Sequence, residues 1–160
     1  MLKIYVEKKS NKWSWNNNGS MKAYVSVAYL EKIAASGGSD IESEGTWESD
    51  DFHIQASGGS DIDMKIDTDE LVVQCSGGSD INMDGRASKV SIMSSGGSDF
   101  NGRKLMTKEA DIKSSGGSDV YIHVSEKLTA RASGASDIHY SGDPKIRDID
   151  ASSSSDVERY

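Results

Sequence analysis

The chain has 160 residues, enough for one domain with a core, but only 35% of them are hydrophobic. Its 18 Lys and Arg residues stand against 26 Asp and Glu residues, a formal net charge of -8 that argues against nucleic acid as a partner. No apolar stretch has the length of a membrane span, so no direct membrane insertion is expected. The lone Cys75 excludes an internal disulfide.

The first 35 residues are predicted to form N-terminal strands and a cap, within a single domain that covers residues 1–160. The alternating segments LKIYVEK (2–8) and MKAYVSVAYL (21–30) are predicted strands, with the polar turn NKWSWNNNGS between them. The start of the chain lacks the apolar run and cleavage site of a signal peptide, which indicates either a cytoplasmic protein or a mature or trimmed chain. The aromatic residues of this region are expected mainly to cap the open end of the core: Trp13, Trp15, Tyr24 and Tyr29.

From residue 36 onward, a hexapeptide of the type SGGSDI returns at a nearly fixed interval. It drifts to SGASDI at 133–138 and to SSSSDV at 152–157. The steps between its aspartates are 21, 19, 19, 20, 18 and 19 residues. These aspartates are predicted to stack in one corner ladder: Asp40, Asp61, Asp80, Asp99, Asp119, Asp137 and Asp156. Self-similarity at such a period is the mark of a repeat architecture.

The residues before each corner alternate between apolar and polar types, which is typical of a strand with one buried face. The third residue before the first serine is almost always β-branched: Ile33, Ile54, Val73, Ile92, Ile112, Ala130 and Ile149. A second apolar column follows the aspartate, and a looser polar segment such as DMKIDTDE (63–70) precedes the next strand.

One unit of about twenty residues cannot bury its own apolar edge, so successive units must stack. The step is too short for the blade of a β-propeller. We therefore predict an all-β parallel β-helix of about seven coils of about 19 residues, with stacked side chains about 4.8 Å apart. Glycine permits the positive φ of a sharp corner, and serine and aspartate can satisfy backbone N–H groups there.

The aspartate ladder is interpreted as a set of turn caps, with calcium binding as the alternative; no metal and no cofactor are expected to be required. The three histidines, His53, His123 and His139, fall in different columns and are expected to face solvent. Cys75 falls in the small inward column, where a buried and inert thiol is expected. No catalytic residue is predicted.

The ordered SGGSDI corners, the preceding YLEKIAA and the late SGDPKI segment resemble the head GIN domain of putative autotransporter adhesins. The resemblance extends from about Leu2 to the C-terminus. It implies a single-stranded right-handed β-helix on a bacterial cell-envelope or extracellular protein, and it brings no catalytic residues. An export signal, usual in this family, is not present in the sequence.

The leading functional prediction is a non-enzymatic binding or adhesion module of the cell surface, with a glycan or protein as ligand. The alternative is a polysaccharide-acting β-helix enzyme, either a lyase or a hydrolase. Trp13 and Trp15 are candidate ligand contacts, because exposed tryptophans stack on sugar rings. The sequence leaves the oligomeric state open.

Overall fold

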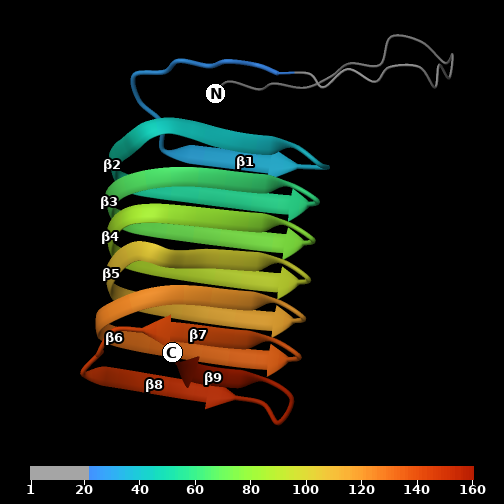
Figure 1. Ribbon diagram of the computed structural model, residues 1–160, viewed down its shortest axis with the longest axis vertical. Coiled ribbons are helices and arrows are strands. Elements are labelled where there is room, and N and C mark those ends of the chain that lie inside the picture. The colour runs from blue at the N-terminus through green and yellow to red at the C-terminus, as the bar shows by residue number, and fades with distance from the viewer. Residues whose placement is uncertain (1–21) are drawn as a thin grey trace, which may run out of the picture.

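The computed structural model describes residues 22–160, which form a parallel β-solenoid of about seven turns with about 19 residues in each turn (Figure 1). This confirms the predicted β-helix and its period, whereas the right-handed winding of the coils stays a prediction. The strands follow one another along the axis: β1 (Lys32–Ser36), β2 (Asp40–Gly58), β3 (Asp61–Gly77), β4 (Asp80–Gly96), β5 (Asp99–Gly116), β6 (Asp119–Gly134), β7 (Asp137–Ser141), β8 (Ile146–Ala151) and β9 (Asp156–Arg159).

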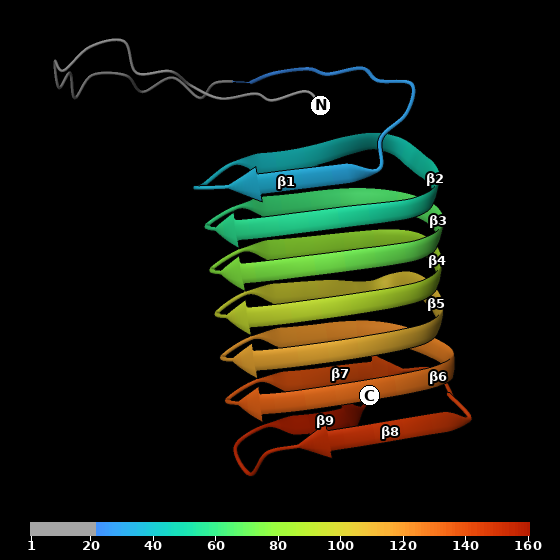
Figure 2. The same ribbon diagram turned by 180° about the vertical axis from the view of Figure 1, so that it is seen from behind.

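All pairings between these strands are parallel, and each coil bonds to the coils before and after it. The path runs from β1 to β7 and then to β9, while β8 pairs with β6. Figure 2 shows the same stack from behind, with β1 at one end and β8 and β9 at the other. Each coil contacts only its neighbours along the axis. Residues at equivalent positions of successive repeats are therefore stacked in columns that run along the rod.

Each of the long strands passes around most of a coil, so the segment predicted to be loose is part of the strand. Residues 63–70 lie within β3 and pair with β4. The alternation of buried and exposed side chains continues up to Thr68 and changes phase at Asp69 and Glu70, which are both exposed. The chain bends at this point, but its hydrogen-bonded pairing with β4 continues on both sides of the bend. The polar composition of the segment therefore hid the strand from sequence analysis.

The core consists of the inward columns predicted from the sequence. Ile54, Val73, Ile92, Ile112 and Ala130 are register partners and have exposures of 1% or less. A second column follows the corner, where Phe100 lies between Ile81 and Val120. Cys75 is buried beside these columns as predicted, and burial raises the pKa of its thiol.

Two predictions for the N-terminal region are wrong where the structure describes it: the strand at 21–30 and the capping role of Tyr24 and Tyr29. Residues 22–30 form no strand, and Tyr24 and Tyr29 are exposed instead of capping the core. β1 bonds only to the second half of β2, residues 53–57. Trp47 covers this end instead, since it packs against the core and its Nε1 donates to the carbonyl of Leu30 at 3.1 Å.

Candidate functional site

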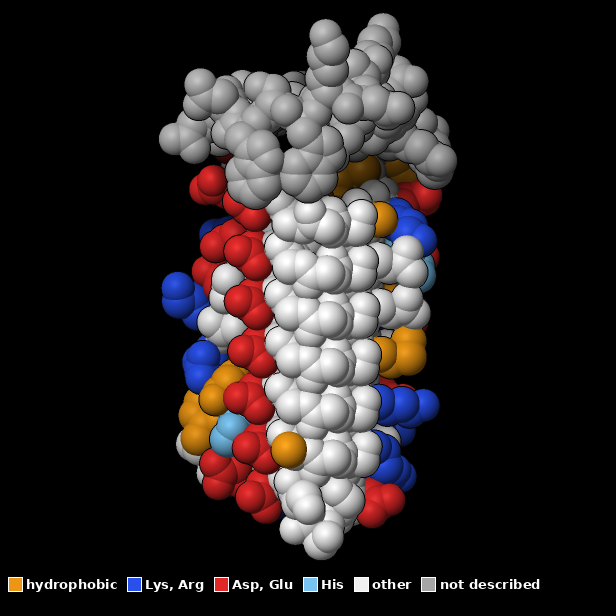
Figure 3. Space-filling view, turned by 90° about the vertical axis from the view of Figure 1, so that its right-hand side faces the viewer, with side chains coloured by type: hydrophobic (Ala, Val, Ile, Leu, Met, Phe, Trp, Pro, Cys, Tyr) orange, Lys and Arg blue, Asp and Glu red, His pale blue; other side chains and the backbone are white. Residues whose placement is uncertain are grey.

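The glycine corner forms a smooth strip along one edge of the rod (Figure 3). In every repeat but the last, which has no glycine, the first glycine of the corner has positive φ, for example 81° at Gly77 and 82° at Gly96. A Cβ at Gly96 would lie 3.0 Å from the backbone N and O of Gly77, so the corner requires glycine for both its φ and its close stacking. At the second glycine, Gly97, a Cβ would meet nothing closer than 3.7 Å. Ala135 at the equivalent place in a later repeat agrees with this difference.

The last serine of each corner closes the turn, and from the second corner onward it is buried. The Oγ of Ser60 accepts from the backbone N–H of Ser57 at 3.1 Å and donates to its carbonyl at 3.2 Å. The same bond to a carbonyl recurs at later corners, and Ser98 also contacts the hydroxyl of Ser94 at 3.0 Å. The buried hydroxyls are therefore satisfied within the turn.

The aspartates of the corner form an outward column beside the glycine strip, seen as a red line in Figure 3. Asp40, Asp61, Asp80 and Asp99 are successive register partners. The carboxylate of Asp99 accepts the backbone N–H of Asp119 at 3.1 Å, and that of Asp137 accepts the N–H of Asp156 at 3.1 Å. Each of these carboxylates thus bonds to the next coil.

The column nevertheless carries an electrostatic strain. Partial burial, followed by the charges of Asp99 and Asp61, raises the pKa of Asp80. Partial burial, followed by Asp99 and Asp137, raises that of Asp119. When the pKa of a carboxyl is higher in the folded than in the unfolded state, ionisation of that carboxyl lowers the stability of the folded protein. That loss is present above the folded pKa and disappears as the pH falls towards the unfolded value.

Replacing Asp80 by asparagine should therefore raise the free energy of unfolding at pH 7 by a few tenths of a kcal/mol, since the group is mostly exposed. Asparagine has nearly the shape of aspartate and keeps one side-chain oxygen, but it removes the charge. The gain should vanish near pH 3. Asp148→Asn is the matched control, because the hydrogen bond and charge of Arg131 lower the pKa of Asp148. It should destabilise at pH 7, and its deficit should shrink in acid. Urea unfolding at both pH values measures the two effects; a less stable Asp80→Asn at pH 7 would contradict the interpretation.

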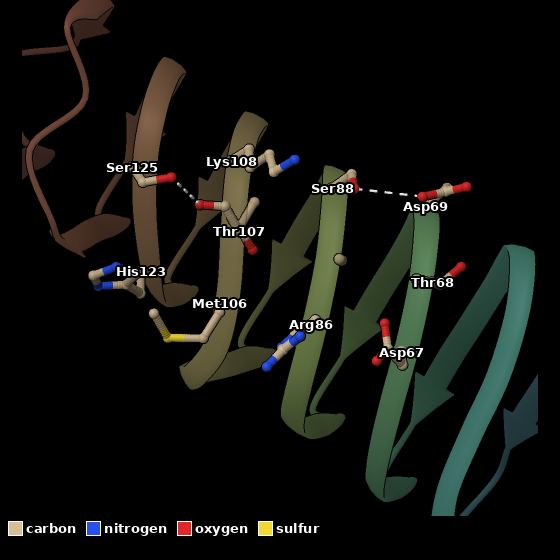
Figure 4. Close-up of a pocket in the computed structure, with 11 residues that line it drawn as sticks. Asp67, Thr68, Asp69, Arg86, Ser88, Met106, Thr107, Lys108, His123 and Ser125 are labelled. Atoms are coloured by element: carbon tan, nitrogen blue, oxygen red, sulfur yellow. Dashed lines mark hydrogen bonds between the residues drawn. The ribbon is translucent and has the colours of Figure 1, made fainter.

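A shallow hollow lies on the bend opposite the glycine corner (Figure 4). It crosses β3, β4, β5 and β6, because Asp67, Arg86 and Met106 are successive register partners and His123 pairs with Met106. Its lining mixes acid, base and thioether: Asp67, Thr68, Asp69, Arg86, Ala87, Ser88, Met106, Thr107, Lys108, His123 and Ser125.

The side chains of this hollow offer hydrogen bonds and charge without enclosing a ligand. The Oγ of Ser88 donates to Asp69 at 3.5 Å, and that of Ser125 donates to the carbonyl of Thr107 at 3.2 Å, both drawn as dashed lines in Figure 4. Met106 is 54% exposed and gives the hollow an apolar centre. A mixed and open surface of this kind suits a polar polymer lying across it better than a small molecule held in a cavity.

A second outward cluster contains residues from four coils and was missed by sequence reasoning. The guanidinium of Arg103 lies 3.5 Å above the ring of Tyr121. His139 stacks on Tyr121 with centroids 4.5 Å apart and contacts Glu158 at 2.9 Å. Tyr160 adds an edge-on contact at 6.3 Å. Aligning the repeats would have placed Tyr121 and His139 in one column, but not Arg103, which lies at a break in the register between β4 and β5 and between β5 and β6.

The remaining predicted residues are placed as follows. His53, His123 and His139 fall in three different columns as predicted, although the last two are half-buried. Trp13 and Trp15 lie outside the described residues. Among residues 22–160, no three His, Cys, Asp or Glu side chains converge in a group that could hold a metal ion. The same part of the chain contains no helix with the length and apolarity needed to cross a membrane.

Two solved structures share this solenoid. A putative adhesin from Bacteroides fragilis superposes with a TM-score of 0.77 at 22% identity, over 82% of this chain and 61% of that one. A putative lipid binding protein from Parabacteroides distasonis gives a TM-score of 0.61 at 16% identity, over 81% of this chain and 62% of that one. The chain therefore spans about three fifths of the length of either neighbour, and at these identities the likeness concerns the fold.

The sequence itself gives a more specific assignment. No curated protein matches the chain. The family model described as "Putative auto-transporter adhesin, head GIN domain" matches residues 1–144, which include the repeats from Ser36 to the SGASDI corner. Because the match covers most of the sequence, the chain belongs to the head GIN domain family of putative auto-transporter adhesins.

Proposed function

We propose that this chain is a non-enzymatic binding module of the bacterial cell surface that attaches to glycans or proteins through its flanks. The observation that carries the proposal is the contrast between inward and outward columns. The outward column of β2 to β6 reads Gln55, Gln74, Met93, Lys113 and Arg131 in register. The chemistry of this column changes from coil to coil, while its inward neighbours remain small or β-branched.

A scaffold with a fixed interior and a variable exterior can present different chemistry at each height without altering its fold. The outward positions that we expect to serve recognition change in this way: His53, Gln55, Gln74, Ser91, Lys113 and Arg131. A shallow flank lacks the enclosed apolar pocket of tight small-molecule sites. Attachment would then depend on many weak contacts made by many copies. The family description supports the adhesive role.

The proposal is tested with beads densely coated with the domain, applied to an array of host and bacterial glycans and to immobilised surface proteins. Coated beads should attach at least a hundredfold more strongly than the monomer in solution. Tight binding by the monomer alone would refute the proposal. Release of new reducing ends or unsaturated products from an acidic or neutral polysaccharide would also refute it, in favour of an enzyme.

Variants locate the contact. Arg86→Ala removes one of the two cations of the hollow on the bend, the other being Lys108, whereas Lys89→Ala removes an exposed cation of the same strand outside that hollow. If the hollow is the contact, bead attachment should fall with the first variant and persist with the second. If beads coated with either variant attach equally well, the contact lies on another flank.

A further inference from the structure

The two ends of the solenoid carry opposite charges at equivalent positions around the coil. Glu31 precedes β1 and receives the N–H of His53 on its carbonyl at 2.8 Å, which places it in the column of Phe52 and Leu71. At the other end, Arg147 pairs with Leu128 in the same column. A column that is apolar through the rod therefore ends in an acid on one side and a base on the other.

The next columns repeat this complementarity. Lys32 at the first end and Asp148 at the last end occupy one column, linked through six register steps: Lys32, His53, Val72, Ser91, Asp111, Thr129 and Asp148. Beside it, Ile33 and Ile149 end the β-branched inward column, and Ile149 is 41% exposed. Polar capping of the two ends would account for charge at these places, but not for opposite signs in two neighbouring columns.

We propose that the C-terminal end of one copy binds the N-terminal end of a second copy, so that β8 adds to the outer edge of β1 as one more parallel coil. All strands run in the same direction, so a simple translation along the axis continues the ladder. It places Arg147 against Glu31, Asp148 against Lys32, and Ile149 against Ile33. Head-to-head or tail-to-tail contacts would instead reverse the strand direction at the junction, so they would not continue the parallel ladder.

The other half of the junction is less favourable. Asp156 would continue the aspartate ladder onto Asp40, as the coils already do, and Val157 would cover the half-exposed Ile41. Glu158 would face Glu42, which is a like-charge pair in an exposed column. Among the described residues, β1 pairs only with β2 and residues 22–30 pair with no strand. Within residues 22–160, the outer edge of β1 therefore has no strand partner. The proposed contact is heterologous, so association should give linear chains.

A zero-length carbodiimide crosslink between an amine and a carboxylate gives a direct test on the full chain. Lys32 and Asp148 lie six coils apart, which is roughly 29 Å within one copy at a coil spacing of about 4.8 Å. A crosslinked peptide joining them must therefore come from two copies. We expect this peptide at high protein concentration and a loss of it in 0.5 M salt. Its absence, together with a monomer at every concentration in analytical ultracentrifugation, would overturn the proposal.

Charge reversal distinguishes this contact from other forms of association. Arg147→Glu and Glu31→Arg should each reduce the crosslinked peptide roughly fivefold to tenfold, as expected for reversing one exposed pair. Mixing the two single variants should restore association as chains in which the variants alternate, since both junctions between unlike variants are attractive and both junctions between like variants repel. The double variant Glu31→Arg with Arg147→Glu should restore chains. Lys89→Glu, in the middle of the rod, is the control and should change nothing.

Arg147 also bonds to Asp143 at 3.2 Å within its own copy, so the thermal unfolding of each variant is compared with that of the unaltered chain. Rescue by the mixture cannot arise from misfolding, because neither partner regains its own residue. Failure of both rescues, or association unchanged by Arg147→Glu, would overturn the proposal. These outcomes are independent of any glycan, so they leave the proposed attachment function to its own test.

Discussion

Replacing Gly96 by valine should lower the free energy of unfolding by about 3–5 kcal/mol, because it adds backbone strain to a steric contact. Gly96 has a φ of 82°, where a β-branched residue is a genuine outlier. Its Cβ would also press on the backbone of Gly77 at 3.0 Å, and backbone in a stacked corner has little room to move. Urea unfolding followed by circular dichroism measures the change.

Gly97→Ala is the matched control at the next position of the same corner. The Cβ would have ordinary contacts there, and the N–H of Gly97, which donates to the carbonyl of Gly77 at 2.7 Å, is kept. The control should change stability by less than about 0.5 kcal/mol. Hydrogen exchange should show that Gly96→Val loses protection in β3 and β5 as well as in β4, since neighbouring coils share the ladder. Equal stability of the two variants would show that the corner tolerates a side chain at either glycine.

The second large effect is expected from Phe100→Ala, which should cost about 3–5 kcal/mol as a large-to-small change in a packed core. Phe100 is fully buried between Ile81 and Val120, so the loss leaves a cavity inside the stack. Met93→Ala removes a side chain that is 41% exposed and should cost under about 1 kcal/mol. Chemical denaturation of the two variants gives the comparison, and similar costs would show that the core collapses freely around position 100.

The environment of Phe100 also provides an internal check on this cavity. A Cβ at Gly102 would lie 2.7 Å from the ring of Phe100, so Gly102→Ala alone should be destabilising. In the Phe100→Ala background, the ring is absent and the same methyl group enters the vacated space. The double variant should therefore be more stable than the sum of the two single effects. Additive losses would mean that the contact with the carbonyl of Tyr121, at 3.2 Å, dominates at Gly102.

The interior of the rod was predictable because its pattern is local and repeated. The aspartate steps predicted the register, and the column of Ile54 and Val73 predicted the buried face. Residues 22–30 have the same alternation, yet they form no strand, so alternation by itself did not determine the structure there. The strand across the bend at Asp69 and Glu70 was missed because two successive polar residues resemble a loop. Only Glu70 departs from the alternation of buried and exposed residues.

The outward surface was less predictable. The hollow brings together Asp67, Arg86 and Met106, which are ordinary in their own coils and gain meaning only from their stacking. The position of Arg103 over Tyr121 depends on breaks in the register, which no fixed period reveals. A surface that varies from coil to coil carries no repeat signal. The part of the molecule that we assign to recognition is therefore the part that periodicity describes least.

The stacking of each coil on its neighbours alone has a mechanical consequence for a rod whose first and last described strands lie at opposite ends. Tension applied along the axis loads the terminal coil first and leaves the interior coils intact. The rod should then unravel one coil at a time, as in a zip fastener, with each event releasing about 19 residues of slack. At about 3.3–3.6 Å per extended residue, that is roughly 60–70 Å for each event. Such a rod would lengthen under a pull in discrete steps and dissipate work at every step, while the coils that remain folded keep their surfaces intact.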